Sequence, residues 1–245
     1  MHNKKIRIAK LLSYYNQGSR REIEKLISQR KIYLNNNLVQ SPVTFANEED
    51  RIIVNDKIVI FKKEVEVFKF YKPYEVICSK NKQDNKKIIY EILDEKFKNF
   101  IFAGRLDFKS EGLLILSNTS DLTRNLELPK NRFERKYEVR VFGFMNIDIL
   151  RKKSQGCIVD GIKYRPFKFK IKSKIKKNTI IEMILTEGKK NEIREIFKSM
   201  NLQVNRLKRL SFGPFTLGNM KPGELKKLTK KEITNYENYI GNKKG

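Results

Sequence analysis

The stretch GRLDFKSEGLLILSN, residues 104–118, places a single carboxylate, Asp107, in a polar turn between two apolar runs. The runs 100–102 and 112–117 are rich in Ile, Leu and Phe and bounded by glycine or polar residues, which predicts two strands. Site residues concentrate on loops between strands, because the strands hold a loop that reaches substrate. Asp107 is therefore a candidate catalytic residue. The alternative is an aspartate that only caps the turn and is screened by Arg105.

The charge of the chain points to a polyanionic partner. Lys and Arg number 54 against 28 Asp and Glu, a net charge of +26 over 245 residues. Nucleic acid is the expected partner, since cations beside phosphates release condensed counterions. Genome composition accounts for part of the lysine content, because Asn and Ile are also abundant. No run approaches the roughly 18 apolar residues of a membrane span, and no basic amphipathic anchor is evident, which argues against a membrane partner.

The scarcity of histidine and cysteine narrows the chemistry. His2 is the only histidine, and Cys78 and Cys157 lie far apart without a CxxC pair. We therefore expect no disulfide framework, no metal site and no histidine-based catalysis. The opening residues MHNKK lead into an amphipathic segment rather than an apolar signal core, so a cytoplasmic location is expected. An enzyme built from this chain has to use carboxylate, tyrosine, lysine or arginine.

Two helices are predicted at the N-terminus. The segment 6–16 carries an apolar helical face, and Ser19 with Glu22 forms the capping-box pattern of a second helix. Arg20 and Arg21 fall in the first turn of that second helix, where the helix dipole disfavours cations. A bound phosphate would reverse that effect.

Short hairpins follow these helices. After Lys31 the sequence predicts a strand, an Asn-rich turn at 35–37 and a second strand, and 51–60 reads as a hairpin through Asn55-Asp56. This unit resembles the S-four RNA-binding domain over about 55 residues, with asparagines in place of its usual Asn-Gly turn. We expect the domain to occupy residues 1–62; a small helical cap on a larger domain is the alternative.

The remainder, residues 63–245, predicts an α+β domain with a large mixed, mainly antiparallel sheet flanked by helices. In ERKYEVRV, Tyr137 faces inward with Val139 and Val141, as a core aromatic would. The pattern at 193–200 predicts a helix packed on the sheet, with Arg194 at the edge of its apolar stripe, the usual place of a solvated charge. Further strands are expected at 167–171 and 179–185, a helix at 88–93 and another from 120 to about 126, and a basic strand around Arg206, Lys208 and Arg209.

Five blocks in order resemble the pseudouridine synthases that modify bacterial ribosomal RNA one uridine at a time. They are KPYEV, GRLDFKSEGLLILSN, RKYEVRV, EGKKNEIREIF and RLKRLSFGPFTLG, which together span most of the chain. The resemblance implies the pseudouridine synthase fold and conversion of uridine to pseudouridine after the base is flipped out. That reaction breaks the glycosidic bond and remakes it at a ring carbon, so no cofactor is expected.

The resemblance also implies roles for single residues. Asp107 becomes the catalytic aspartate, acting as a nucleophile or as a stabiliser of sugar cation character. Tyr137 becomes the aromatic that stacks on the target base, with a hydroxyl able to assist proton removal, and Arg194 the basic partner of the aspartate. Arg105 is expected to fill the space left by the base. The remaining substrate-binding residues expected are Lys72, Arg20, Arg21 and Lys31.

Some positions depart from the family pattern and other functions stay open. Glu75 stands where glycine is usual, and residues 189–191 and Glu195 replace residues that are often Arg and Asn. The ending GPFTLGNMKPGE favours the branch of the family that acts on large-subunit ribosomal RNA. We expect the partner to be ribosomal RNA or a ribosomal assembly intermediate, and the protein to be a monomer. One alternative is a non-catalytic RNA-binding ribosome-assembly protein. Another is a metal-dependent nuclease using Asp107 with Glu111.

Overall fold

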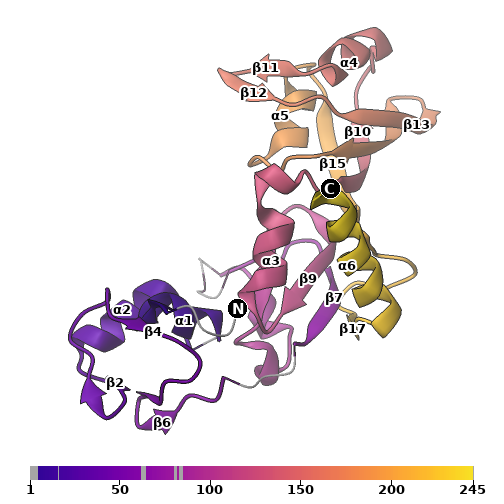
Figure 1. Ribbon diagram of the computed structural model, residues 1–245. Helices are drawn as coiled ribbons and strands as arrows, with labels where there is room; N and C mark the ends of the chain where they lie inside the picture. The colour runs from indigo at the N-terminus through magenta and orange to yellow at the C-terminus, as the bar shows by residue number, and fades with distance from the viewer. Residues whose placement is uncertain (1–4, 16, 62–64, 80–81, 83–84, 245) are drawn as a thin grey trace.

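The computed structural model describes residues 5–15, 17–61, 65–79, 82 and 85–244, apart from the side chains of Asp121 and residues 242–244. Figure 1 shows a small N-terminal lobe beside a larger, elongated part that holds the sheet. The α+β class and the large mixed sheet flanked by helices are as expected from the sequence.

The small lobe combines two helices with short strands. Its elements are β1 (Ile6–Arg7), α1 (Ile8–Tyr14), α2 (Arg20–Ser28), β2 (Ile32–Leu34), β3 (Asn37–Leu38), β4 (Phe45–Ala46), β5 (Ile52–Val54) and β6 (Lys57–Ile58). The capping box is confirmed: the backbone N–H of Glu22 donates to Ser19 Oγ at 3.2 Å, and that of Ser19 donates to Glu22 Oε2 at 2.6 Å. Asn55 and Asp56 form the predicted hairpin turn with φ of 48° and 63°.

The first helix is shorter than predicted. Ile6 and Arg7 pair as a strand with Ala46 and Phe45, so the helix begins at Ile8. At residues 6–7 the backbone pairs with a strand instead of continuing the helix, and the helical pattern of the sequence does not show that this partner strand exists. The expected domain boundary at residue 62 lies outside the described residues.

The larger part is built on a nine-stranded sheet. Its strands are β7 (Val67–Lys72), β8 (Ile101–Ala103), β9 (Glu111–Ser117), β10 (Arg135–Phe142), β13 (Lys168–Ile175), β14 (Asn178–Leu185), β15 (Gln203–Phe212), β16 (Phe215–Thr216) and β17 (Leu225–Lys227). The order is β13-β14-β10-β15-β9-β7-β17, with β8 on β9 and β16 on β15. Every described pairing is antiparallel except that of β9 with β15, which is parallel.

The parallel contact depends on Gly112. A Cβ placed on this residue would lie 2.4 Å from the backbone oxygen of Arg209, and its φ is +106°. Only glycine tolerates this close approach of two backbones. The contact places the start of β9, directly after the Asp107 loop, beside Arg209.

Apolar residues cover both faces of the sheet. On β9, Leu114 and Leu116 belong to one buried cluster, whereas Leu113 and Ile115 belong to another on the opposite face. A strand buried on both faces reads as a continuous apolar run, which explains why 112–117 shows no alternation.

Helices and a small hairpin flank the sheet. They are α3 (Ser120–Glu127), α4 (Ile147–Ser154), α5 (Glu192–Lys198), α6 (Lys230–Lys244), the hairpin β11 (Cys157–Val159) with β12 (Ile162–Tyr164), and short 3-10 turns η1 (Ile89–Glu91), η2 (Glu95–Phe97) and η3 (Pro129–Asn131). The predicted helix at 88–93 is only the turn η1, and the sequence reasoning missed α4, α6 and the β11–β12 hairpin. Figure 1 shows α3 and α6 beside β9 and β7, and α4 and α5 near the far end of the sheet.

Candidate active site

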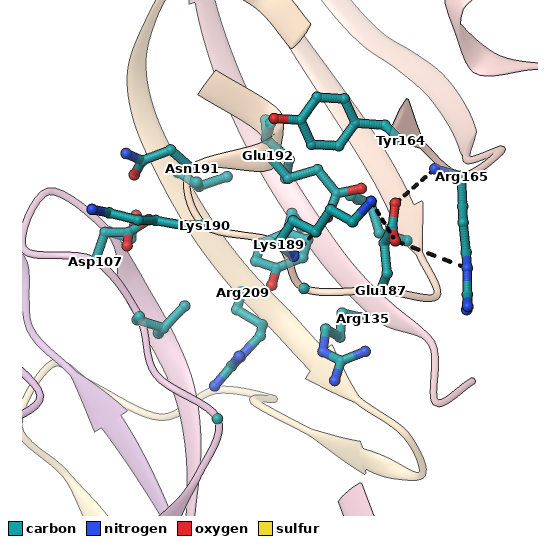
Figure 2. Close-up of a pocket in the computed structure, with 18 of the residues that line it drawn as sticks. Asp107, Arg135, Tyr164, Arg165, Glu187, Lys189, Lys190, Asn191, Glu192 and Arg209 are labelled. Atoms are coloured by element: carbon teal, nitrogen blue, oxygen red, sulfur yellow. Dashed lines mark hydrogen bonds and ion pairs between the residues drawn. The ribbon is translucent and has the colours of Figure 1, made fainter. Parts of the chain in front are cut away.

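A cavity of about 1510 Å³ opens where the Asp107 loop meets β10, β15 and the segment between β14 and α5. Arg105, Asp107 and Tyr137 all line it. Figure 2 shows Asp107 at one end of the cavity and Arg165 with Glu187 at the other. A cavity of this size has room for a flipped nucleotide and its neighbours.

Asp107 is exposed to this cavity, while the loop behind it is held firmly. The three carbonyls that follow it in sequence each accept a hydrogen bond, two from the segment 72–75 and one from Arg194. The Phe108 carbonyl accepts from the backbone N–H of Glu75 at 2.9 Å, that of Lys109 from Arg194 Nη2 at 2.5 Å, and that of Ser110 from Lys72 Nζ at 2.6 Å. Loop motion therefore has to break three hydrogen bonds to two distant segments, which keeps the carboxylate in place.

Lys72 has an internal position rather than the substrate-facing one expected. Its side chain is 0% exposed, and Nζ donates to the carbonyls of Pro73 and Ser110. Burial lowers the pKa of Lys72 to about 8, against the opposing influence of Cys78 and Asp107. In this structure Lys72 holds the backbone of the Asp107 loop and does not line the cavity.

Arg194 lies next to Asp107 without pairing with it. Its guanidinium donates to the carbonyls of Val204 at 2.8 Å and Lys109 at 2.5 Å, and among the described residues it has no hydrogen bond or ion pair with Asp107. Burial lowers the pKa of Arg194, and the negative charge of Asp107 works in the opposite direction. The fork-shaped guanidinium thus joins the Asp107 loop to the start of β15.

Tyr137 reaches the cavity from the middle of the sheet. It is 9% exposed, and its neighbours across the ladder are Met183 on β14 and Arg209 on β15. The inward orientation predicted from alternation is confirmed. Arg105, by contrast, is exposed on the same loop as Asp107 and can move without disturbing the core.

Two buried arginines at this cavity were not singled out from the sequence. Arg135 and Arg209 line the cavity at 8% and 2% exposure; Arg209 lies on the basic strand expected from the sequence, with its side chain buried. Arg135 shares the face of Tyr137 two residues away, and the alternation of ERKYEVRV, extended by one step, would have found it.

A pair of acidic residues lies at the opposite wall. Glu187 Oε1 accepts from the backbone N–H of Arg165 at 2.6 Å, and Lys189 Nζ lies 3.6 Å from Oε2 (Figure 2). Burial and the neighbouring Glu187 raise the pKa of Glu192, which favours a shared proton between the two carboxyl groups. The residues that replace the family's usual Arg and Asn at 189–191 therefore border an acidic patch of the cavity.

Glu111 does not form a metal site with Asp107. Its carboxylate accepts hydrogen bonds from Tyr71 Oη at 2.9 Å and from Arg206 Nε. Burial works to raise the pKa of Glu111, but the bonds from Arg206 and Tyr71 hold it below its usual value. Within the described residues no group of three His, Cys, Asp or Glu is placed to hold a metal ion.

The N-terminal candidates lie apart from this cavity. Arg20 and Arg21 are the first two residues of α2, as predicted, and both are exposed, as is Lys31 beyond the end of that helix. None of them lines the cavity. No described helix is long and apolar enough to cross a membrane.

The fold of this chain is similar to that of a solved protein, and its sequence matches two family models. A solved structure titled as a pseudouridylate synthase superimposes with a TM-score of 0.66 over 94% of this chain and 98% of its own, at 24% identity. A model of RNA pseudouridylate synthase matches residues 66–199, and an S4 domain model matches residues 6–52. The chain therefore belongs to the RNA pseudouridylate synthase family, a family of isomerases, and carries the S-four domain inferred from its sequence.

Relatives match along nearly the whole chain. A protein of Rickettsia felis named as an uncharacterized RNA pseudouridine synthase is 36% identical over 225 residues, covering 92% of this chain and 97% of that protein. A protein of Buchnera aphidicola named ribosomal large subunit pseudouridine synthase B is 30% identical and covers 96% of this chain and 97% of its own. A Bacillus subtilis protein of the same name is 28% identical, with 93% of each chain covered.

Proposed function

We propose that this protein converts a specific uridine of ribosomal RNA, in the large subunit, to pseudouridine. The observation that carries the proposal is the Asp107 carboxylate, which is exposed to the cavity on a loop held by the segment 72–75 and by Arg194. The similarity to proteins named ribosomal large subunit pseudouridine synthase B supports the choice of substrate. We further propose that the protein acts as a monomer in the cytoplasm.

The proposed chemistry assigns one role to each cavity residue. The flipped uridine stacks on Tyr137, while Arg105 enters the gap left in the RNA. Asp107 attacks the sugar carbon or stabilises its cationic character while the glycosidic bond breaks. The detached base turns and a ring carbon bonds to the sugar carbon, which releases Asp107 as a free carboxylate if Asp107 had attacked that carbon. The proton of the ring carbon is then lost. The ring nitrogen that left the sugar gains a proton, so the reaction is a redox-neutral isomerisation that consumes no co-reactant.

The N-terminal unit supplies further RNA contacts in this proposal. Arg20, Arg21 and Lys31 are exposed cations on the domain matched by the S4 model, and a phosphate near the start of α2 would be attracted by the helix dipole. We propose domain limits of 1–62 and 63–245, consistent with family-model matches that end at 52 and begin at 66.

The test is Asp107→Asn, which removes the charge while keeping the size of the side chain. Pseudouridine in ribosomal RNA is mapped in cells that lack the protein and are complemented with either form. We expect the variant to form no pseudouridine while binding RNA as the wild type does. Asp160→Asn is the matched control, because Asp160 is an exposed aspartate outside the cavity. Pseudouridine formation by Asp107→Asn at the wild-type rate would overturn the proposal.

A further inference from the structure

Arg135 and Arg209 form an unusual pair at the floor of the cavity. The guanidinium carbon of Arg135 lies 4.5 Å from the centre of the Phe212 ring, and that of Arg209 lies 5.0 Å from the same centre. Phe212 is itself fully buried. Two positive charges are therefore held beside one aromatic ring, nearly out of contact with solvent.

Neither charge has a carboxylate partner among the described residues. Arg135 donates to the carbonyls of Phe133 at 3.0 Å and Leu126 at 3.4 Å, and Arg209 Nε donates to that of Leu113 at 2.7 Å. Arg209 Nη2 is buried and has no hydrogen-bond partner. An unpaired buried donor on a charged group costs a few kcal/mol, so these residues are arranged for something the free protein lacks.

The surroundings favour an anion at this place. Burial lowers the pKa of Arg135 most and the positive charge of Arg209 also lowers it, while Tyr137, Glu192 and Glu127 act in the opposite direction. Glu127 accepts from the backbone N–H of Gly104 at 2.8 Å, and the carboxyl group of Glu192 is favoured in its neutral form. The two guanidinium groups therefore retain an uncompensated positive charge.

The register of the sheet ties this pair to Tyr137. Arg209 is the direct neighbour of Tyr137 across the β10–β15 ladder, and Arg135 lies two residues before Tyr137 on the same face of β10. Directly opposed residues on neighbouring antiparallel strands, such as Arg209 and Tyr137, have Cβ atoms about 5 Å apart. A nucleotide whose base stacks on Tyr137 would thus bring one of its own phosphates to the arginines.

We propose that Arg135 and Arg209 form a binding site for the phosphodiester group attached to the flipped uridine, and so position its sugar against Asp107. This inference rests on the proposed function, because it takes the base to lie on Tyr137. Guanidinium groups suit the task, since their forked N–H groups match the geometry of phosphate oxygens. The pair acts by positioning the substrate and takes no part in bond breaking.

A direct test measures ligand binding to the full chain without catalysis. Thermal unfolding is followed with uridine 5′-monophosphate or uridine at constant ionic strength. We expect the nucleotide to raise the Tm of the wild type and of Arg140→Met, an exposed arginine on the same strand, and to raise it much less in Arg135→Met and Arg209→Met. An equal rise in all four proteins would overturn the proposal.

A second test uses RNA, and its deciding comparison is made on the wild-type protein alone. After the target uridine is mapped, its 5′ or 3′ phosphodiester is replaced by a neutral methylphosphonate in a short RNA. We expect one of the two replacements to slow the wild-type reaction roughly 10- to 100-fold, which corresponds to the loss of a charge-assisted hydrogen bond. The same replacement should slow Arg209→Met little further, because that variant already lacks the contact.

The controls separate this inference from the proposed function. A methylphosphonate several nucleotides away should have little effect on the rate. If neither adjacent replacement slows the wild type more than the distant one, the phosphate site is wrong while the proposed function stands. If the wild type modifies no ribosomal RNA, the proposed function fails, and the nucleotide-binding result still decides whether the arginines bind phosphate.

Discussion

Arg194 Nη2 donates a hydrogen bond to the carbonyl of Lys109 at 2.5 Å, two residues beyond Asp107. Its Nη1 donates to the carbonyl of Val204 at 2.8 Å, so one side chain joins the catalytic loop to β15. The expected basic partner of the aspartate therefore holds the loop backbone rather than the carboxylate. The negative charge of Asp107 nevertheless opposes the lowering of the Arg194 pKa by burial.

Replacing Arg194 should impair the reaction more than RNA binding. We expect Arg194→Met to lower the single-turnover rate roughly 10- to 100-fold, since two hydrogen bonds from a charged group position the loop. The RNA dissociation constant should change less than threefold. Lys198→Met on the exposed side of α5 is the control. A wild-type rate in Arg194→Met would show that the loop does not need this contact.

Lys72 makes stability depend on pH in the alkaline range. Its pKa is lowered from 10.5 to about 8, so between these values the unfolded chain holds a proton that the folded chain has lost. Stability therefore rises with pH across this window. Relative to Lys72→Met, the free energy of unfolding of the wild type should increase by on the order of 2 kcal/mol from pH 7.5 to pH 10.

Chemical denaturation across this pH range measures the effect. Lys69→Met is the matched control, because Lys69 lies on the same strand and its ammonium lies 2.6 Å from a carboxylate oxygen of Glu232. Burial and the hydrogen bond to Glu111 raise the pKa of Tyr71 to about 12; its contribution is common to all the proteins and cancels in the difference. If the difference in free energy of unfolding between the wild type and Lys72→Met does not change with pH, the lowered pKa of Lys72 is wrong.

Glu75 adopts a backbone conformation that favours glycine. Its φ is +56°, so the turn keeps a left-handed geometry although glutamate stands where glycine is usual in the family. A left-handed backbone costs a residue that has a Cβ about 1–2 kcal/mol of folding free energy. Glycine avoids this cost, but it loses more conformational entropy on folding, which offsets part of the gain. We expect Glu75→Gly to raise the free energy of unfolding by up to about 1 kcal/mol. Glu75→Ala, which keeps the strain, should give no gain.

The start of α2 should contribute to RNA affinity through charge. Replacing Arg20 and Arg21 by alanine is expected to weaken RNA binding and to reduce the slope of log K against log salt by roughly 1.5, the value for two phosphate contacts. Lys230 and Lys231 begin α6 and are also exposed, so their double alanine variant is the control. An unchanged slope in the α2 variant would argue against the N-terminal unit as an RNA anchor.

Much of the local structure was predictable because it depends on neighbours in sequence. The capping box at Ser19, the Asn55-Asp56 turn and the inward face of Tyr137 all follow from spacing within a few residues. The helices α4 and α6 were missed because their apolar residues are few. On α6, Tyr236 is buried against Phe215 of β16 and against Phe133 of the loop before β10, contacts that no local pattern reveals.

The sequence by itself determined the order of the elements, the position of Asp107 between two strands, and the resemblance that names its family. Only the tertiary structure decided which charged groups are buried and what they contact. Strand register and the β9–β15 contact set three of these positions. They are those of Lys72 under the Asp107 loop, Arg194 at the Lys109 carbonyl and Arg209 beside Tyr137. Periodicity reports which face a side chain takes, whereas the partner of a buried charge is set by segments far away in the chain.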